Sequence, residues 1–287
     1  MGEKDIAEKI LEDYNDVFAD IINVLVFGGN KVVEQDDLVE SGVHSQYKAD
    51  DSKLHELERD TAKYWREKGV ELVLYGIENQ TKPDKLMPAR VFAYDGASYR
   101  SQIASKRDHL LPVVTIVLYF GDKHWDETKS LKGMLNIPKE LEDFVNDYKI
   151  KVFEIAWLPD ETIAKFTSDF RIVADFFKKR RIDPEYIPDS LDEIHHVDEV
   201  LKLLQVFTGD ERYTAILMDD GAKEVHNMCD VAERLERKGR AEGTKPLYLL
   251  VQDGSVSPDK AAAAMGISVS ELEKAMTDAG FKIPSMV

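Results

Sequence analysis

The sequence is short of cysteine, of positive charge and of long apolar runs. Cys229 is the single cysteine among 287 residues, which excludes intramolecular disulfides and a cysteine-rich zinc site and suits a reducing compartment. The longest apolar run, residues 110–120, contains Pro112 and is too short to span a bilayer. The first twelve residues are charged and lack the apolar core of a signal peptide. We therefore expect a soluble cytoplasmic protein without a membrane partner.

Acidic residues outnumber basic ones by 55 to 38, which gives a formal net charge of -17. Proteins that coat nucleic acid are usually basic, so the balance disfavours that class, although a local basic groove can coexist with an acidic exterior. The length and a hydrophobic fraction of 43% suffice for a sizeable core in one large domain or two smaller ones. Global disorder is not expected.

Apolar periodicity predicts an α/β core over residues 1–182. Helical spacing covers 6–26, and the polar stretch 35–57 is predicted to be mostly loop. The further predicted elements are a hairpin with arms at 60–65 and 70–80, a helix from Pro88 to about Arg107, strands at 113–120 and 151–157, and a helix at 161–179. The strand–helix–strand unit implies parallel strands joined by a right-handed crossover.

The composition changes near residue 182. A basic run at 178–181 is followed, over 183–199, by seven acidic residues and no Lys or Arg. We predict a mainly helical C-terminal extension over 183–287, with helices at about 196–207, 210–219 and 221–240, a break at Pro246, and two short helices around 265–268. The last two resemble a helix-turn-helix, but the second has little positive charge for a major groove. Packing or homo-oligomerisation is the favoured role for this pair.

Asp60, Glu78 and Gln80 are the candidates for chemistry. Glu78 and Gln80 stand two positions apart on a strand and therefore share a face at its carboxyl end, where α/β sheets place ligands. With the turn centred at 68–69, Asp60 would lie opposite Ile77, and a shift of one residue would put it opposite Glu78. Two neighbouring carboxylates need solvation, protonation or a bridging cation, and Mg²⁺ is a hard, oxygen-ligated ion that would remove the repulsion.

This Asp–hairpin–Glu-x-Gln pattern is accompanied by other characteristic stretches. They are residues 17–23, 59–60, 75–81, 87–90, 94–99, 112–115, 118–121, 146–150 and 168–171. Together they resemble the Rpn family of recombination-promoting nucleases, also called YhgA-like transposases, a branch of the PD-(D/E)XK nuclease superfamily. The resemblance covers roughly residues 6–182 and implies a restriction-endonuclease-like mixed sheet flanked by helices.

The resemblance implies a Mg²⁺-dependent DNA endonuclease, with Mn²⁺ as a substitute ion, linked to recombination or mobile elements. It implies that Asp60 and Glu78 are catalytic metal ligands and that Asp20 is a further acidic residue near the ion. Gln80 stands where the superfamily has Lys. A neutral amide can hydrogen-bond to water or phosphate, but it cannot supply a positive charge.

Basic residues on or near the predicted crossover helix are candidates for contacts to the DNA backbone. They are Arg90, Arg100 and Arg107. Arg contacts to phosphate supply affinity without reading sequence, whereas the alternative is an ordinary solvated helix face. The run 178–181 is better explained as a helix end that complements the helix dipole than as a DNA grip.

Two alternative functions stay open at this stage. The presence of Gln80 in place of the superfamily's Lys and the acidic net charge fit a catalytically inactive DNA- or protein-binding module on the same fold. This alternative predicts no metal binding at Asp60 and Glu78. The family name also allows a true transposase that acts by strand transfer. Strand-transfer products from a marked donor DNA would separate that activity from plain cleavage.

Overall fold

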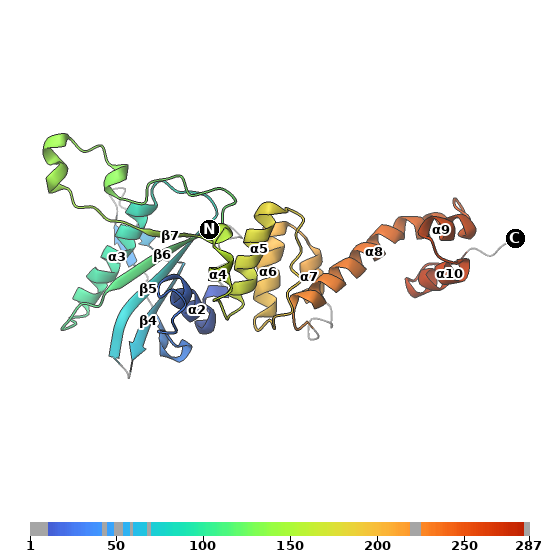
Figure 1. Ribbon diagram of the computed structural model, residues 1–287, viewed down its shortest axis with the longest axis horizontal. Coiled ribbons are helices and arrows are strands. Elements are labelled where there is room, and N and C mark those ends of the chain that lie inside the picture. Colours follow the sequence, from blue (N-terminus) through green and yellow to red (C-terminus); the bar gives the residue numbers. More distant parts are fainter. Residues whose placement is uncertain are drawn as a thin grey trace. The chain divides into compact units, whose positions relative to one another are not determined.

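A computed structural model describes residues 11–41, 45–48, 54–57, 60–67, 70–218 and 225–283 (Figure 1). The chain divides into two compact units, 1–227 and 228–287. The boundary predicted at residue 182 does not coincide with this division, because the segment after it packs within the first unit. The ring of Phe207 lies 6.5 Å from that of Phe120 and 4.6 Å from that of Phe177.

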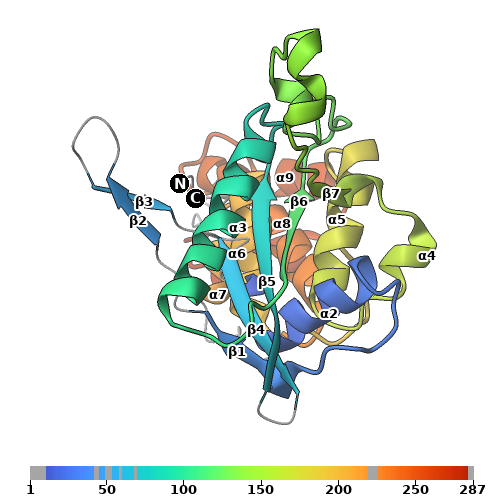
Figure 2. The same ribbon diagram turned by 90° about the vertical axis from the view of Figure 1, so that its left-hand side faces the viewer.

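The first unit is built on a mixed five-stranded sheet with the order β1-β4-β5-β6-β7. The strands are β1 (Leu38–Glu40), β4 (Thr61–Glu67), β5 (Val70–Gln80), β6 (Val113–Tyr119) and β7 (Lys151–Glu154). β1, β4 and β5 pair antiparallel, whereas β5, β6 and β7 pair parallel. α3 (Met87–Ala104) makes the predicted crossover between β5 and β6 (Figure 2). β2 (Ser45–Lys48) and β3 (Leu54–Leu57) form a separate two-stranded sheet.

The two faces of β5 meet different helices, and alternation along the strand decides which side chain faces which. Glu78 faces Arg90 of α3, with 3.7 Å between the carboxylate and the guanidinium. Asn79 faces the other way and contacts Glu12, just before α2 (Asn15–Leu25). A cluster of buried side chains packs α3 against β6. It consists of Met87, Val91, Val117, Tyr119, Trp125 and Ile150.

The predictions for the N-terminal region were right about the helix and wrong about the loop. Residues 6–10 of the predicted helix lie outside the described residues, and the described part is interrupted at Asp13 and Tyr14 before α2. The stretch predicted as loop contains a 3-10 helix, η1 (Gln35–Asp37), and strands β1, β2 and β3. These strands are only three or four residues long, so they are too short to show a periodicity, and partner strands decide their conformation.

The single helix predicted over 161–179 is wrong, because the structure has two. α4 (Asp160–Ile163) and α5 (Phe170–Ile182) are separated by a segment whose backbone N–H groups are bound by Asp20. β7 is also shorter than predicted, since the chain turns into a 3-10 helix, η4 (Ile155–Trp157). Between β6 and β7 lie two more 3-10 helices, η2 (Lys132–Met134) and η3 (Lys139–Phe144).

The helices predicted near 196–207 and 210–219 are confirmed as α6 (Val197–Thr208) and α7 (Arg212–Leu217). In the second unit, α8 (Met228–Gln252) runs through Pro246, so the predicted break there is wrong. Proline removes one N–H and frees the carbonyl four residues earlier, and both Pro246 and Glu242 are exposed, so water can satisfy that carbonyl. Residues 221–224 of the predicted third helix lie outside the described residues.

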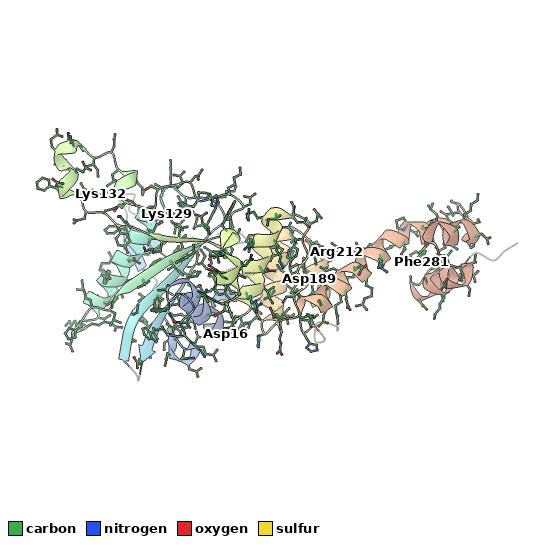
Figure 3. The ribbon with its side chains drawn as sticks, in the orientation of Figure 1. Asp16, Lys129, Lys132, Asp189, Arg212 and Phe281 are labelled. Carbon is green, nitrogen blue, oxygen red and sulfur yellow. The ribbon has the colours of Figure 1, made fainter. Side chains whose placement is uncertain are left out.

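The predicted pair of short C-terminal helices is confirmed as α9 (Pro258–Met265) and α10 (Val269–Asp278). Gly266 turns the chain between them with φ of 69°, a left-handed conformation that glycine adopts without strain. The unit has its own apolar cluster, which includes Phe281, labelled in Figure 3. The ring of Phe281 lies 5.5 Å from that of Tyr248. Across the described residues, none of the helices combines the length and the apolar character needed to cross a bilayer.

Candidate active site

A β-bulge brings Asp60 next to Glu78. Close to the turn Arg66 pairs with Glu71, which is the register expected from the sequence. The register then shifts between Trp65 and Arg66, so that Thr61 pairs with Ile77 further along. Asp60 precedes β4 and is therefore adjacent to Glu78, near the end of β5. A bulge adds one residue to one strand and so shifts the pairing by one position. The hairpin therefore adopts the second of the two predicted registers, in which Asp60 lies opposite Glu78.

The two acidic groups are held by different contacts. The backbone N–H of Asn79 donates to Oδ2 of Asp60 at 2.8 Å, which fixes the Asp60 carboxylate at the strand end. Glu78 is only 1% exposed, and Nη2 of Arg90 lies 3.7 Å from its Oε2. A buried carboxylate requires a compensating charge or donor, and Arg90 supplies part of it here.

Glu12 is a third acidic residue near this site, and the sequence pattern did not indicate it. The side-chain amide of Asn79 donates to its Oε2 at 2.7 Å, and the residue is 1% exposed. Burial raises the pKa of Glu12 well above its usual range; the charges of Asp60, Asp13 and Glu78 raise it further, and the Asn79 hydrogen bond opposes them. Oε1 of Glu12 is buried with no hydrogen-bond partner among the described residues. The sequence signal was faint: one acid beside apolar Leu11.

α3 adds a fixed cation and a tyrosine to the site. Nη1 of Arg90 lies 3.0 Å from Oδ2 of Asp84, and the other oxygen of Asp84 accepts the N–H of Leu86 where α3 begins. Burial opposes the charge on Arg90, but Tyr94, Asp84 and Glu78 together raise its pKa, so the guanidinium stays protonated. Burial also raises the pKa of Tyr94, and the Glu78 charge adds to that.

Gln80 occupies the last position of β5, partly exposed, on the same face as Glu78. It pairs with Tyr119 of β6, and its carbonyl accepts the N–H of Phe120 at 2.9 Å. The backbone at this point is therefore firmly held between two strands. The partly exposed amide side chain lies at the carboxyl end of β5, where it can reach a molecule bound beside the carboxylates.

The structure places Asp20 in a different environment. Its carboxylate accepts the backbone N–H groups of Thr167 and Ser168, each at 2.8 Å, and both hydroxyl groups at 3.2 and 2.8 Å. These four bonds tie α2 to the segment before α5. Asp20 is thus not brought together with Asp60 and Glu78, and its contacts are those of a structural residue.

Replacing Asp20 with Ala is expected to destabilise the fold by about 2–4 kcal/mol, because four hydrogen bonds to a buried carboxylate would be lost. Nicking activity per folded molecule should stay within about twofold of wild type. Urea unfolding followed by circular dichroism gives the first quantity, and a plasmid assay normalised to folded protein gives the second. Asp20→Asn, which keeps one acceptor oxygen, is the milder comparison. Wild-type stability combined with lost activity in that variant would instead put Asp20 in the reaction.

The other two candidate DNA contacts lie far from the carboxylates. Nη2 of Arg107 lies 2.5 Å from Glu71, at the opposite end of β5, about 23 Å from Glu78 at the rise of a strand. Partial burial raises the pKa of Glu71, but hydrogen bonds from Arg66 and Arg107 outweigh it and hold the value low. Arg100 is exposed on α3. Only Arg90 of the three predicted residues joins the candidate site.

The donor set suits a hard divalent ion. Among the side chains that the structure describes, no three of His, Cys, Asp or Glu converge to hold a metal by themselves. Mg²⁺ does not require such a group, since it keeps several waters and uses one or two protein carboxylates. Asp60 and Glu78 provide two, and the buried Oε1 of Glu12 is an unsatisfied acceptor in the same region. The residues therefore fit Mg²⁺.

The fold and the site define an α/β protein with acidic residues gathered at the carboxyl end of a central strand. A family model described as "Putative transposase, YhgA-like" matches residues 66–214, just over half of the chain, and the chain belongs to that family. Glu78, Gln80 and Arg90 lie inside the match, whereas Glu12 and Asp60 precede it. No curated protein and no solved structure matches the chain.

Proposed function

We propose that this protein is a Mg²⁺-dependent DNA endonuclease with a restriction-endonuclease-like core. The observation that carries the proposal is the meeting of Asp60 and Glu78 at the end of β5, produced by the bulge in the hairpin. The mixed sheet flanked by helices and the membership of the YhgA-like family support it. A role in recombination or in mobile elements is part of the same proposal.

Asp60 and Glu78 would hold the ion, and Mn²⁺ would substitute for Mg²⁺. When bound, the ion lowers the pKa of its water and neutralises charge that develops on the phosphate. Arg90 offers guanidinium N–H donors to the phosphate oxygens next to Glu78, a contact that strengthens as negative charge builds up. Gln80 would orient water or phosphate by hydrogen bonding alone.

Glu12 is best described as a positioning residue. Asn79 donates its backbone N–H to Asp60 and its side-chain N–H to Glu12, so the strand end is held from both sides. The neighbours of Asn79 in the chain are Glu78 and Gln80, whose side chains face the opposite side of the sheet from that of Asn79. Holding Asn79 therefore sets the position of both.

The proposal is tested by nicking of supercoiled plasmid with Mg²⁺, with Mn²⁺ and with EDTA, together with calorimetric titration of Mg²⁺ into the full chain. We expect relaxed and linear products only when an ion is present, and one ion bound at this site. A protein that binds DNA but neither cleaves it nor binds the ion would be the inactive binding module instead. The buried Arg90–Glu78 contact, which compensates the carboxylate without a metal, is the observation that favours this second candidate.

Strand transfer is the remaining candidate, and membership of a family described as transposases favours it. A labelled donor duplex incubated with a plasmid target distinguishes the reactions. Covalently joined donor and target would identify a transposase, whereas cleaved plasmid without joined products would identify a nuclease.

A further inference from the structure

A pocket of about 360 Å³ opens directly beyond Gln80, at the carboxyl ends of β5 and β6. Its walls include Thr81, which follows β5, Asp122, which follows β6, and Arg180 near the end of α5. The volume is within the range of small-molecule sites, roughly 300–1,000 Å³. Open α/β sheets place ligands at this edge. The roles proposed above for Asp60 and Glu78 do not involve this pocket.

One side of the pocket is aromatic. Phe120, Phe177 and Phe207 line it. The rings of Phe120 and Phe177 lie 4.9 Å apart and those of Phe177 and Phe207 lie 4.6 Å apart, so the three support one another. A rigid aromatic wall favours a flat, apolar group such as a nucleobase.

Arg180 is the cation that the pocket offers to an anion. The other members of the basic run are engaged: Lys178 with Asp160 at 2.6 Å, Lys179 with Asp175 at 2.9 Å, and Arg181 over the Trp157 ring at 3.8 Å. Arg180 is partly exposed, packs on the Phe176 ring and makes no hydrogen bond or ion pair with a described residue. The run lies at the carboxyl end of α5, which agrees with the helix-dipole explanation, and Arg180 is the member of the run that is left to bind a ligand.

The acidic groups near Arg180 do not neutralise it. Asp210 is already bound by Arg212, whose Nε and Nη2 donate to its two oxygens at 2.9 and 2.7 Å. Asp122 lies in the pocket wall and is exposed, where it can accept the exocyclic amino group of a base.

We propose that this pocket holds a nucleotide that flanks the scissile phosphate, with its phosphate on Arg180 and its base against the aromatic wall. The inference rests on the proposed nuclease function. Thr81 is three residues beyond Glu78, about 10 Å at the rise of a strand, which a nucleic-acid strand covers in a few nucleotides at about 3.4 Å each. A base can reach such a pocket only when it leaves the stack, so single-stranded or frayed DNA is the substrate class that fits.

The test compares the full chain with Arg180→Ala and with Arg171→Ala. Arg171 is a matched control on the same helix, since it pairs with Asp192 at 3.5 Å and lies outside this pocket. Binding of a fluorescent single-stranded oligonucleotide is followed by anisotropy in EDTA, over a series of salt concentrations. We expect Arg180→Ala to bind about tenfold more weakly with a salt slope lower by about one, and Arg171→Ala to change less than twofold. With Mg²⁺, KM should rise in Arg180→Ala while kcat stays constant.

Each outcome separates this inference from the proposed function. Equal binding by both variants, with wild-type cleavage intact, would overturn the subsite and leave the nuclease standing. Binding that depends on Arg180 without cleavage under any ion would support the subsite on a binding module and overturn the nuclease. A deoxynucleoside monophosphate that binds more tightly than the oligonucleotide would overturn the subsite in favour of a free-nucleotide site. Failure of the wild type to bind or cleave DNA would overturn both.

Discussion

Glu78→Gln and Asp60→Asn are each expected to lower Mg²⁺-dependent plasmid nicking by at least about 100-fold. A metal ion stabilises a phosphoryl-transfer transition state by several kcal/mol, and each 1.36 kcal/mol is worth tenfold in rate. Both substitutions keep the shape of the side chain while removing a charged ligand. Initial rates of nicking, measured on protein of matched thermal stability, give the loss, and calorimetry should find Mg²⁺ affinity reduced in both variants.

Glu71→Gln is the control for this experiment. It is the same substitution on the same strand, at the end where Glu71 pairs with Arg66 and Arg107. We expect it to cost at most about 1 kcal/mol of stability and to leave nicking within about twofold, because partly exposed ion pairs contribute little. Wild-type nicking rates in either site variant would refute the assignment of the ligands.

Glu12→Gln is expected to make the metal-free protein more stable than wild type at high pH. The raised pKa of Glu12 means that the folded state binds more protons than the unfolded state above the ordinary value of 4.5. Wild-type stability therefore falls as the pH rises from that value through the raised pKa, and a Gln that cannot ionise escapes this loss. The gain should be about 1–3 kcal/mol, the usual cost of a poorly compensated buried polar group.

Urea unfolding of both proteins in EDTA, from pH 5 to pH 9, measures the difference. Gln can still accept the Asn79 hydrogen bond, so the variant is expected to fold. Added Mg²⁺ should stabilise wild type increasingly as the pH rises, because a nearby cation favours the ionised Glu12, and this pH dependence should flatten in the variant. Parallel pH profiles for the two proteins would rule out a buried, protonated Glu12.

The local elements were readable because their causes are local. The run at 70–80 is apolar on both faces, as a central strand requires, and Pro88 lies in the first turn of α3, where a missing N–H has no cost. Short strands such as β1 carry no such signal, since three residues cannot show a period. The C-terminal helix pair was readable from the turn around Gly266, which separates two short helical patterns.

The candidate site was only partly predictable. The hairpin predicted from the sequence places Asp60 and Glu78 near each other. Whether they lie directly opposite depends on the bulge at Trp65 and Arg66, which no sequence pattern indicated. Glu12 reaches Asn79 across 67 positions of the chain. Such contacts depend on how helices pack on the sheet, so spacing along the chain cannot reveal them.

By itself, the sequence determined the α/β class, the crossover, the acidic pair and the family. The first three follow from periodicity, turn residues and side-chain chemistry, all of which are properties of neighbouring residues, whereas the family follows from the resemblance to known sequences. Tertiary structure decided which acids share a site: it brought Glu12 in, left Asp20 on the backbone of residues 167–168, and paired Arg107 with distant Glu71. The physical reason is that burial and charge compensation depend on neighbours in space, and folding chooses those neighbours.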